Sequence, residues 1–228
     1  MAASSRVVLV CNAPLEPMSA KRLQQAVREP GTVVVGVDGG AARLQRFGIL
    51  PHVVTGDFDS LTKDDVTRLR TSGATIVPTP DQDYTDFDKA LTYVRETYPG
   101  AAIAVFGAVG GRLDHTVSVL SAVIKHGVFG GADIRLIDAV GETRPVRGGE
   151  RIYTGDDLPG RVVSLLALGT VRGVTLSGVR WALNNETLAP GVRDGALNEI
   201  TNTQVSVRCE RDAPLLVQVH HAPRVSGA

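Results

Sequence analysis

The sequence predicts an α/β fold: an N-terminal, doubly wound, mostly parallel sheet with helices on both faces, followed by a C-terminal all-β sandwich or jelly roll. Two observations predict the first part. Short β-branched runs alternate with helical patterns up to about residue 137, and most runs end at Gly, Asp or Pro. A third observation predicts the second part, because beyond residue 149 the apolar runs are short and show no helical period. We place the domain boundary between residues 143 and 144.

The first part contains six candidate strands, each a short apolar run. They are Val7–Cys11, Thr32–Val37, His52–Thr55, Ala74–Val77, Ala101–Phe106 and Ile134–Ile137. Helical patterns separate them, and two of these helices begin at capping sequences, Thr62 with Asp65 and Thr85 with Asp88. Strands that alternate with helices imply right-handed crossovers and a parallel sheet. Ligands of such sheets gather at the carboxyl ends of the strands.

The second part contains candidate strands separated by Gly, Pro and Asn. They are Arg161–Leu168, Val171–Val179, Val205–Glu210 and Leu215–His220. Alternation of apolar and polar residues is typical of strands with one buried face. We therefore expect a sandwich or jelly roll, with its strand order open.

Composition narrows the classes of partner. Lys plus Arg and Asp plus Glu each total 24, and this balance gives no sign of a nucleic acid or an anionic membrane surface. The two cysteines, Cys11 and Cys209, do not suggest a disulfide framework and favour a reducing compartment. No apolar run approaches the length of a membrane span. We expect a cytoplasmic protein with neither a nucleic-acid nor a membrane partner.

Asp57 and Asp59 are the strongest candidates for chemistry. They follow the apolar run Val53-Val54 and are two residues apart, so strand periodicity directs both to one side. Two close carboxylates repel unless a cation or proton lies between them, and carboxylate oxygens suit Mg²⁺ that carries phosphates. An isolated pair of this kind is usually a solvated turn. Further charged residues at the predicted strand ends favour the metal hypothesis: Asp38, Asp83, Asp86, Arg112 and Asp114.

The Gly-rich segment Gly107–Gly111 joins a predicted strand to a helix, where backbone amides could hold a phosphate. It matches neither the P-loop nor the dinucleotide fingerprint, and alone it could be a flexible turn. Arg112 could clamp phosphate oxygens, or it could simply pair with Asp114. Trp181, the single Trp, could belong to the β core or stack on a heteroaromatic ligand.

Several motifs, taken in order along nearly the whole chain, resemble the thiamine pyrophosphokinases. They are Asp38-Gly39-Gly40-Ala41, Gly56-Asp57-Phe58-Asp59-Ser60, Asp81-Gln82-Asp83-Tyr84-Thr85-Asp86-Phe87, Gly110-Gly111-Arg112-Leu113-Asp114-His115 and Gly178-Val179-Arg180-Trp181-Ala182-Leu183. Asn198-Glu199 also resembles a signature near the family's C-terminus. This chain departs from it at Leu197, where the family usually has Ser.

The resemblance implies Mg²⁺ with ATP as co-substrate, thiamine as substrate, and a homodimer with active sites at the subunit interface. It implies an ATP- and Mg-binding catalytic domain over residues 1–143 and a thiamine-binding domain over residues 144–228. Implied metal ligands are Asp57, Asp59, Asp83 and Asp86, and implied catalytic residues are Asp57, Asp59, Asp86, Arg112 and Asp114. Implied nucleotide contacts are Asp38, Gly39, Asp83, Gly110 and Gly111, and implied substrate contacts are Ser177, Trp181 and Asn198.

The implied reaction is attack of the thiamine hydroxyl on the β-phosphorus of ATP, with AMP as leaving group. Such a reaction needs positioning and charge neutralisation, which many acids and one Arg can supply. Either Asp86 or Asp114 could act as base. A diphosphokinase for another hydroxymethyl substrate, such as a pterin, is the nearest alternative. A non-catalytic thiamine or nucleotide sensor is another, and a haloacid-dehalogenase-like phosphatase is disfavoured because its D-x-D motif follows the first strand.

Overall fold

The computed structural model describes residues 6–223, which form two compact units. Within the described residues, unit 1 comprises 6–122 and 132–139, and unit 2 comprises 123–131 and 140–223. The predicted boundary between residues 143 and 144 falls inside a strand of unit 2, since that strand spans Gly141–Pro145.

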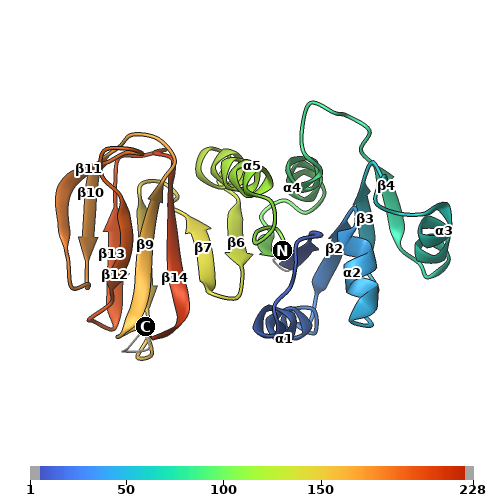
Figure 1. The fold of residues 1–228 in the computed structure, drawn as a ribbon, viewed down its shortest axis with the longest axis horizontal. Coiled ribbons are helices and arrows are strands. Elements are labelled where there is room, and N and C mark those ends of the chain that lie inside the picture. The colour runs from blue at the N-terminus through green and yellow to red at the C-terminus, as the bar shows by residue number, and fades with distance from the viewer. Residues whose placement is uncertain (1–5, 224–228) are drawn as a thin grey trace. The chain divides into compact units, whose positions relative to one another are not determined.

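Unit 1 is an α/β unit with the predicted alternation (Figure 1). Each predicted strand of this part is confirmed to within one residue at either end. The strands are β1 (Arg6–Val10), β2 (Thr32–Val37), β3 (Val53–Gly56), β4 (Thr75–Pro78), β5 (Ala102–Phe106) and β6 (Asp133–Ile137). The helices are α1 (Pro17–Ala26), α2 (Gly40–Arg46), α3 (Lys63–Thr71), α4 (Asp86–Thr97) and α5 (Leu113–Val123).

The strand order of unit 1 is β6-β5-β1-β2-β3-β4, and every neighbouring pair is parallel. The chain moves in one direction from β1 to β4, then returns past β1 to β5 and continues to β6. Right-handed crossovers therefore place α1, α2 and α3 on one face of the sheet and α4 and α5 on the other. The predicted doubly wound sheet is confirmed.

Burial explains why these runs form strands in a sheet covered on both faces. Val7 to Val10 of β1 are all at most 2% exposed, as expected for a central parallel strand. Leu23 of α1 and Leu44 of α2 join Val34 of β2 in one apolar cluster. Helix α3 begins as predicted, because Thr62 and Asp65 form a reciprocal capping box.

Unit 2 is a β-sandwich. Its strands are β7 (Gly141–Pro145), β8 (Glu150–Thr154), β9 (Arg161–Ala167), β10 (Val171–Ser177), β11 (Leu183–Leu188), β12 (Gly195–Glu199), β13 (Gln204–Arg208) and β14 (Leu215–Pro223). They form two antiparallel sheets ordered β12-β9-β14-β7 and β11-β10-β13-β8. Side chains of both sheets share one core, in which Leu165 and Val217 meet Val174 and Val207. The predicted all-β sandwich is confirmed.

Four strands of unit 2, β7, β8, β11 and β12, were not predicted. Their sequences lack an apolar run: β7 reads Gly-Glu-Thr-Arg-Pro, and β11 buries only its two terminal leucines, Leu183 and Leu188. Of these four, β8, β11 and β12 each lie at the end of a sheet, and β7 pairs with the well-buried β14. Pairing with a stronger neighbour overrides weak strand propensity at such positions.

The helical stretch after β5 changes its helix type near its end. Helix α5 passes into a π-helical segment, η1 (Ile124–Phe129), which contacts β7 and β14. Although η1 lies between α5 and β6 in sequence, it belongs to unit 2 by its contacts. None of the described helices combines the length and apolarity that crossing a bilayer requires.

Tyr153 of β8 gives a test of the sandwich core. Among the described residues its buried hydroxyl has no hydrogen-bond partner, and burial raises its pKa to about 12. An unsatisfied buried polar group costs about 1–3 kcal/mol. We expect Tyr153→Phe to raise the free energy of unfolding by about 1 kcal/mol, measured by urea denaturation.

Tyr98→Phe is the matched control, because the Tyr98 hydroxyl has a side-chain partner in Tyr93. This control should give no gain in stability. An equal gain from both variants, or a loss from Tyr153→Phe, would contradict the assignment of an unsatisfied hydroxyl in the core.

Candidate active site

Unit 1 has a pocket at the point where its strand order reverses, between β1 and β5. The loops after β1 and β5, which are neighbouring strands, lead to helices on opposite faces. A pocket of about 620 Å³ lies at the carboxyl ends of the strands. Its lining comprises Cys11, Asn12, Ala13, Pro14, Val37, Asp38, Asp57, Gln82, Asp83, Tyr84, Thr85, Asp86, Phe87, Lys89, Gly111, Arg112 and His115.

Three carboxylates at this edge form one group. Asp38 follows β2, and Asp57 and Asp59 follow β3, and one oxygen from each lies within 4.8 Å of the others. Asp38 is 9% exposed, and its Oδ1 has no hydrogen-bond partner among the described residues. A buried carboxylate oxygen without a donor is costly unless a cation or proton approaches it. The group therefore has the donor chemistry of a hard divalent cation site.

Local backbone geometry holds this group in place. Asp38 has a φ of 46°, in the left-handed region, and its N–H donates to Thr55 O at 2.7 Å. Gly56 has a φ of 147°, and a Cβ on it would lie 3.0 Å from the Asp38 Cβ. Gly56 is therefore required for the close approach of Asp38 to the end of β3.

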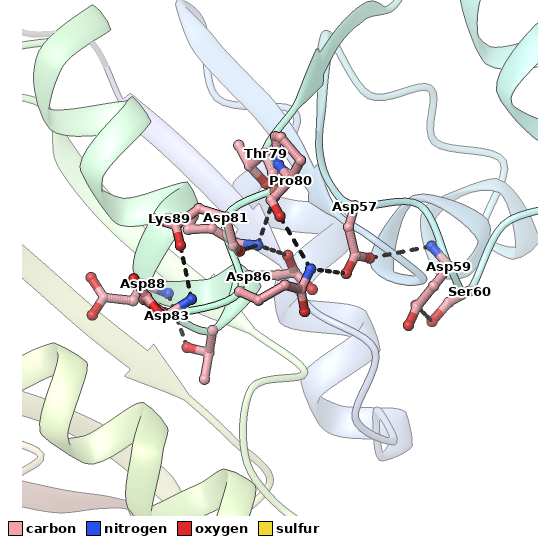
Figure 2. Close-up of polar contacts among 12 residues, drawn as sticks. Asp57, Asp59, Ser60, Thr79, Pro80, Asp81, Asp83, Asp86, Asp88 and Lys89 are labelled. Carbon is pink, nitrogen blue, oxygen red and sulfur yellow. Dashed lines mark hydrogen bonds and ion pairs between the residues drawn. The ribbon is translucent and has the colours of Figure 1, made fainter.

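Hydrogen bonds hold Asp57 in its charged form. Asp57 Oδ1 accepts from the Asp59 N–H at 3.2 Å, and Asp57 Oδ2 accepts from Gln82 Nε2 at 3.3 Å (Figure 2). These donors lower the pKa of the Asp57 carboxyl. Asp59 in turn accepts from Ser60 Oγ at 3.1 Å. The Asp57 side chain thus enters the group as a carboxylate.

Asp83 and Asp86 line the pocket but lie outside this three-carboxylate group. The Asp83 N–H donates to Asp81 Oδ1 at 2.8 Å, which closes a tight turn before α4. Asp86 Oδ1 lies 2.8 Å from Lys89 Nζ, an ion pair by distance that lacks hydrogen-bond geometry. The structure therefore separates the four predicted metal ligands into Asp57 and Asp59 on one side and Asp83 and Asp86 on the other.

Arg112 and Asp114 pair with each other across the start of α5. Arg112 Nε and Nη2 donate to the Asp114 carboxylate at 3.1 and 2.5 Å, and both side chains are largely exposed. Arg112 lowers the pKa of Asp114 to about 2. Gly110 and Gly111 beside them are open, because no heavy atom of residues 6–223 lies within 4 Å of a Cβ built on either. Gly39 is not, because a Cβ there would lie 2.3 Å from the Asn12 amide.

The three predicted substrate contacts belong to unit 2. Trp181 is 55% exposed and Arg180 Cζ lies 5.6 Å from the centre of its ring. Asn198 is 8% exposed: its Oδ1 accepts from the Trp181 N–H at 3.1 Å, and its Nδ2 donates to the Trp181 carbonyl at 2.7 Å. Asn198 thus fixes the Trp181 main chain. Ser177 is exposed at the end of β10.

Leu197, beside Asn198, has a φ of 61° and is 60% exposed. Its N–H donates to Ser164 Oγ at 3.0 Å. This is the position where the chain departs from the signature described above, and it presents an apolar side chain to solvent.

Sequence reasoning missed three lining residues: Asn12, Gln82 and Lys89. Asn12 follows β1, and Arg43 Nη2 donates to its carbonyl at 2.8 Å. Gln82 belongs to the motif that begins at Asp81, but no role was predicted for it. Lys89 is three residues after Asp86 on a helix, and this i,i+3 spacing could have indicated an ion pair.

Comparison with known proteins agrees with this architecture. The model of the thiamin pyrophosphokinase catalytic domain matches residues 25–135, and that of the thiamin pyrophosphokinase vitamin B1 binding domain matches residues 150–213. The chain belongs to the thiamine pyrophosphokinase family.

Relatives in this family cover most of the chain. A thiamine pyrophosphokinase of Bacillus subtilis is 31% identical over 175 residues, which is 76% of this chain and 80% of the relative. Thiamin pyrophosphokinase 1 of Caenorhabditis elegans is 28% identical over 184 residues, 76% of this chain and 74% of the relative.

Solved structures of the family share the fold. The crystal structure of thiamine pyrophosphokinase from Bacillus subtilis superposes with a TM-score of 0.79 at 26% identity, covering 96% of this chain and 99% of that one. The thiamin pyrophosphokinase from Geobacillus thermodenitrificans gives a TM-score of 0.77 at 26% identity, covering 97% and 98%.

The two hydrogen bonds between the Asn198 side chain and the Trp181 main chain can be tested by substitution. Asn198→Ala removes two side-chain contacts to the Trp181 main chain, and we expect the free energy of unfolding of unit 2 to fall by about 1–3 kcal/mol. Emission from the single Trp reports the transition directly. Ser177→Ala, at an exposed position, should change stability by less than about 0.5 kcal/mol. Equal effects from the two variants would remove Asn198 from this role.

Proposed function

We propose that this chain is an ATP-dependent thiamine diphosphokinase that transfers the diphosphoryl group of ATP to the hydroxyl of thiamine and releases AMP. One observation carries the proposal: the carboxylates of Asp38, Asp57 and Asp59 converge beside a 620 Å³ pocket, and Asp38 contributes a buried, unpartnered oxygen. Membership of the thiamine pyrophosphokinase family supplies the substrates.

The donor set fits Mg²⁺. All donors are carboxylate oxygens, the ligands that Mg²⁺ prefers, and an orphaned oxygen on Asp38 is satisfied by a cation. We propose Asp57 and Asp59 as principal ligands, with Asp83 and Asp86 completing the site through water or phosphate. Bound Mg²⁺ would neutralise charge on the ATP phosphate oxygens.

The chain's own residues would position the reactants. Arg112 reaches phosphate oxygens bidentately once it leaves Asp114, and the open backbone at Gly110 and Gly111 lets phosphates approach. We propose Asp38 and Gly39 as further contacts at the edge of the nucleotide site.

In the reaction the thiamine oxygen forms a bond to the β-phosphorus while the bond from that phosphorus to the oxygen of the α-phosphate breaks. AMP leaves with the bonding electrons, and the hydroxyl proton passes to a carboxylate. Arg112 lowers the pKa of Asp114 to about 2, so Asp114 is a weak base while this pair is intact. We propose Asp86, which lines the pocket, as the base.

We propose that residues 1–143 hold ATP and metal and residues 144–228 hold thiamine, with Trp181 stacking on the thiamine ring. Exposure of Trp181 supports a ligand contact over a core role. Ser177 would be a polar neighbour, and Asn198 would act through the Trp181 main chain. We further propose a homodimer with active sites at the subunit interface, located in the cytoplasm, on the family resemblance.

The first experiment is AMP release from ATP and Mg²⁺ with thiamine, with a hydroxymethylpterin or with no acceptor, followed by product identification. We expect AMP and thiamine diphosphate with thiamine alone. AMP release with the pterin alone would identify a pterin, and not thiamine, as the acceptor. Tight thiamine binding without product would indicate a sensor.

The metal hypothesis predicts the behaviour of Asp59→Asn. The neutral amide is a poor ligand for Mg²⁺, so we expect kcat/KM to fall by at least about 100-fold with an unchanged thermal midpoint. Asp64→Asn, on the exposed first turn of α3, is the matched control and should retain full activity. Full turnover in Asp59→Asn would remove this residue from the metal site.

The stacking hypothesis predicts the behaviour of Trp181→Leu. Stacking of a heteroaromatic ring on an aromatic side chain contributes about 1–3 kcal/mol, so KM for thiamine should rise roughly 10- to 100-fold. KM for ATP should stay within twofold, because the proposed nucleotide residues lie in unit 1. Equal increases in both KM values would point instead to misfolding or to a different role for Trp181.

A further inference from the structure

Lys89 holds an unusual position for a lysine. Its side chain is 9% exposed, and Nζ donates to two main-chain carbonyls, Thr79 O and Asp81 O, each at 2.7 Å (Figure 2). Nζ also lies 2.8 Å from Asp86 Oδ1. An ammonium group has three protons; here two donate to carbonyl oxygens, and the Asp86 carboxylate offsets the charge as an ion pair. The charge is therefore fully engaged within the protein, although Lys89 lines the pocket.

These partners come from the segment between β4 and α4, and from α4 itself. The same segment is tied to β3, because the Thr79 N–H donates to Gly56 O at 2.9 Å. Without a cation at Nζ, two carbonyl oxygens and the Asp86 carboxylate would face the same point with nothing to offset their repulsion. Lys89 thus fixes the path of the chain from Thr79 to Asp86.

That path determines where Gln82 lies. Gln82 Nε2 donates to Pro80 O at 3.2 Å and to Asp57 Oδ2 at 3.3 Å. Gln82 is itself exposed, so the fixed main chain on either side supplies its orientation. The contacts thus run from the Lys89 ammonium through the Thr79–Asp81 carbonyls and Gln82 to the Asp57 carboxylate.

We infer that Lys89 is a positioning residue for the acidic site: it orders residues 79–83 so that Gln82 orients Asp57, and it holds Asp86 at the pocket wall. This inference rests on the proposed function, in which these acids hold the metal. Lys89 touches neither substrate nor metal in this role, and no contact to phosphate is assigned to it. Lys89 contacts the proposed ligand Asp86 directly, and residues that contact a metal ligand in this way typically contribute 10- to 100-fold to metal affinity.

The test uses Lys89→Met, which keeps the length of the side chain and removes its charge. Two readouts on the full chain without nucleotide are hydrogen exchange of residues 79–83 and binding of Mn²⁺ followed by electron paramagnetic resonance. We expect faster exchange confined to this segment and a loss of Mn²⁺ affinity of about 10- to 100-fold. Lys21→Met, at an exposed position on α1, is the control and should change neither readout.

A general structural role would lower the thermal midpoint and speed exchange throughout unit 1, with Mn²⁺ affinity per folded molecule unchanged, and would overturn the inference. The exchange readout does not need a metal. If wild-type protein binds no Mn²⁺, the proposed metal site fails, and exchange of residues 79–83 alone decides the role of Lys89.

Gln82→Met provides a variant that keeps the fold if Lys89→Met does not, because Gln82 is exposed. It removes only the last link, the bond to Asp57, and leaves the Lys89 contacts in place. We expect a smaller loss of Mn²⁺ affinity, roughly two- to tenfold. Unchanged Mn²⁺ affinity in Gln82→Met would show that the Gln82 hydrogen bond does not orient Asp57 for metal binding, and it would overturn the inference.

Discussion

The site depends on a reversal in strand order at β1 and β5. The chain builds the sheet outward from β1 to β4 and then returns to place β5 on the other side of β1. Right-handed crossovers force the loops after these neighbouring strands to opposite faces, and this leaves a pocket at their carboxyl ends. Small residues permit the close approach that follows. A Cβ on Gly40 would lie 2.0 Å from Val10 O, and one on Gly107, where φ is 63°, would lie 2.7 Å from Cys11 O. These glycines are therefore consequences of the topology.

The acidic site carries a cost in stability. Asp38 and Phe58 adopt left-handed backbone conformations with φ values of 46° and 65°, and each such residue costs about 1 kcal/mol or more. Three carboxylates within 4.8 Å of one another add electrostatic repulsion. Buried strands and the Lys89 contacts offset this cost. A cation that binds only the folded state would stabilise it further by mass action.

Sequence reasoning succeeded where local pattern and tertiary structure agree. The inner parallel strands of unit 1, β1, β2, β3 and β5, are largely buried and read as apolar runs. The predicted strand positions and the predicted caps at Thr62 and Thr85 are confirmed. The strands β7, β8, β11 and β12 of unit 2 were not predicted because pairing with a neighbour, and not their own composition, makes them strands. β7, which has no Val, Ile or Leu, shows this most clearly.

The acidic residues of the candidate site could be predicted from the sequence, but the contacts between its residues could not. Charged residues that follow strands indicated the pocket edge, and Asp38, Asp57, Asp83, Asp86 and Arg112 line it. The grouping of Asp38 with Asp57 and Asp59 depends on the register of β2 against β3, and the role of Asn198 depends on its pairing with Trp181. Long-range register of this kind cannot be derived from single-sequence periodicity.

The position of η1 in the chain has a consequence for how this architecture can evolve. Residues 123–131 belong to the sandwich unit by their contacts, yet β6, which follows them, belongs to the α/β unit. No single break in the sequence therefore separates all residues of unit 1 from all residues of unit 2. A recombination event that exchanged only the C-terminal portion would leave η1 without its native contacts to β7 and β14.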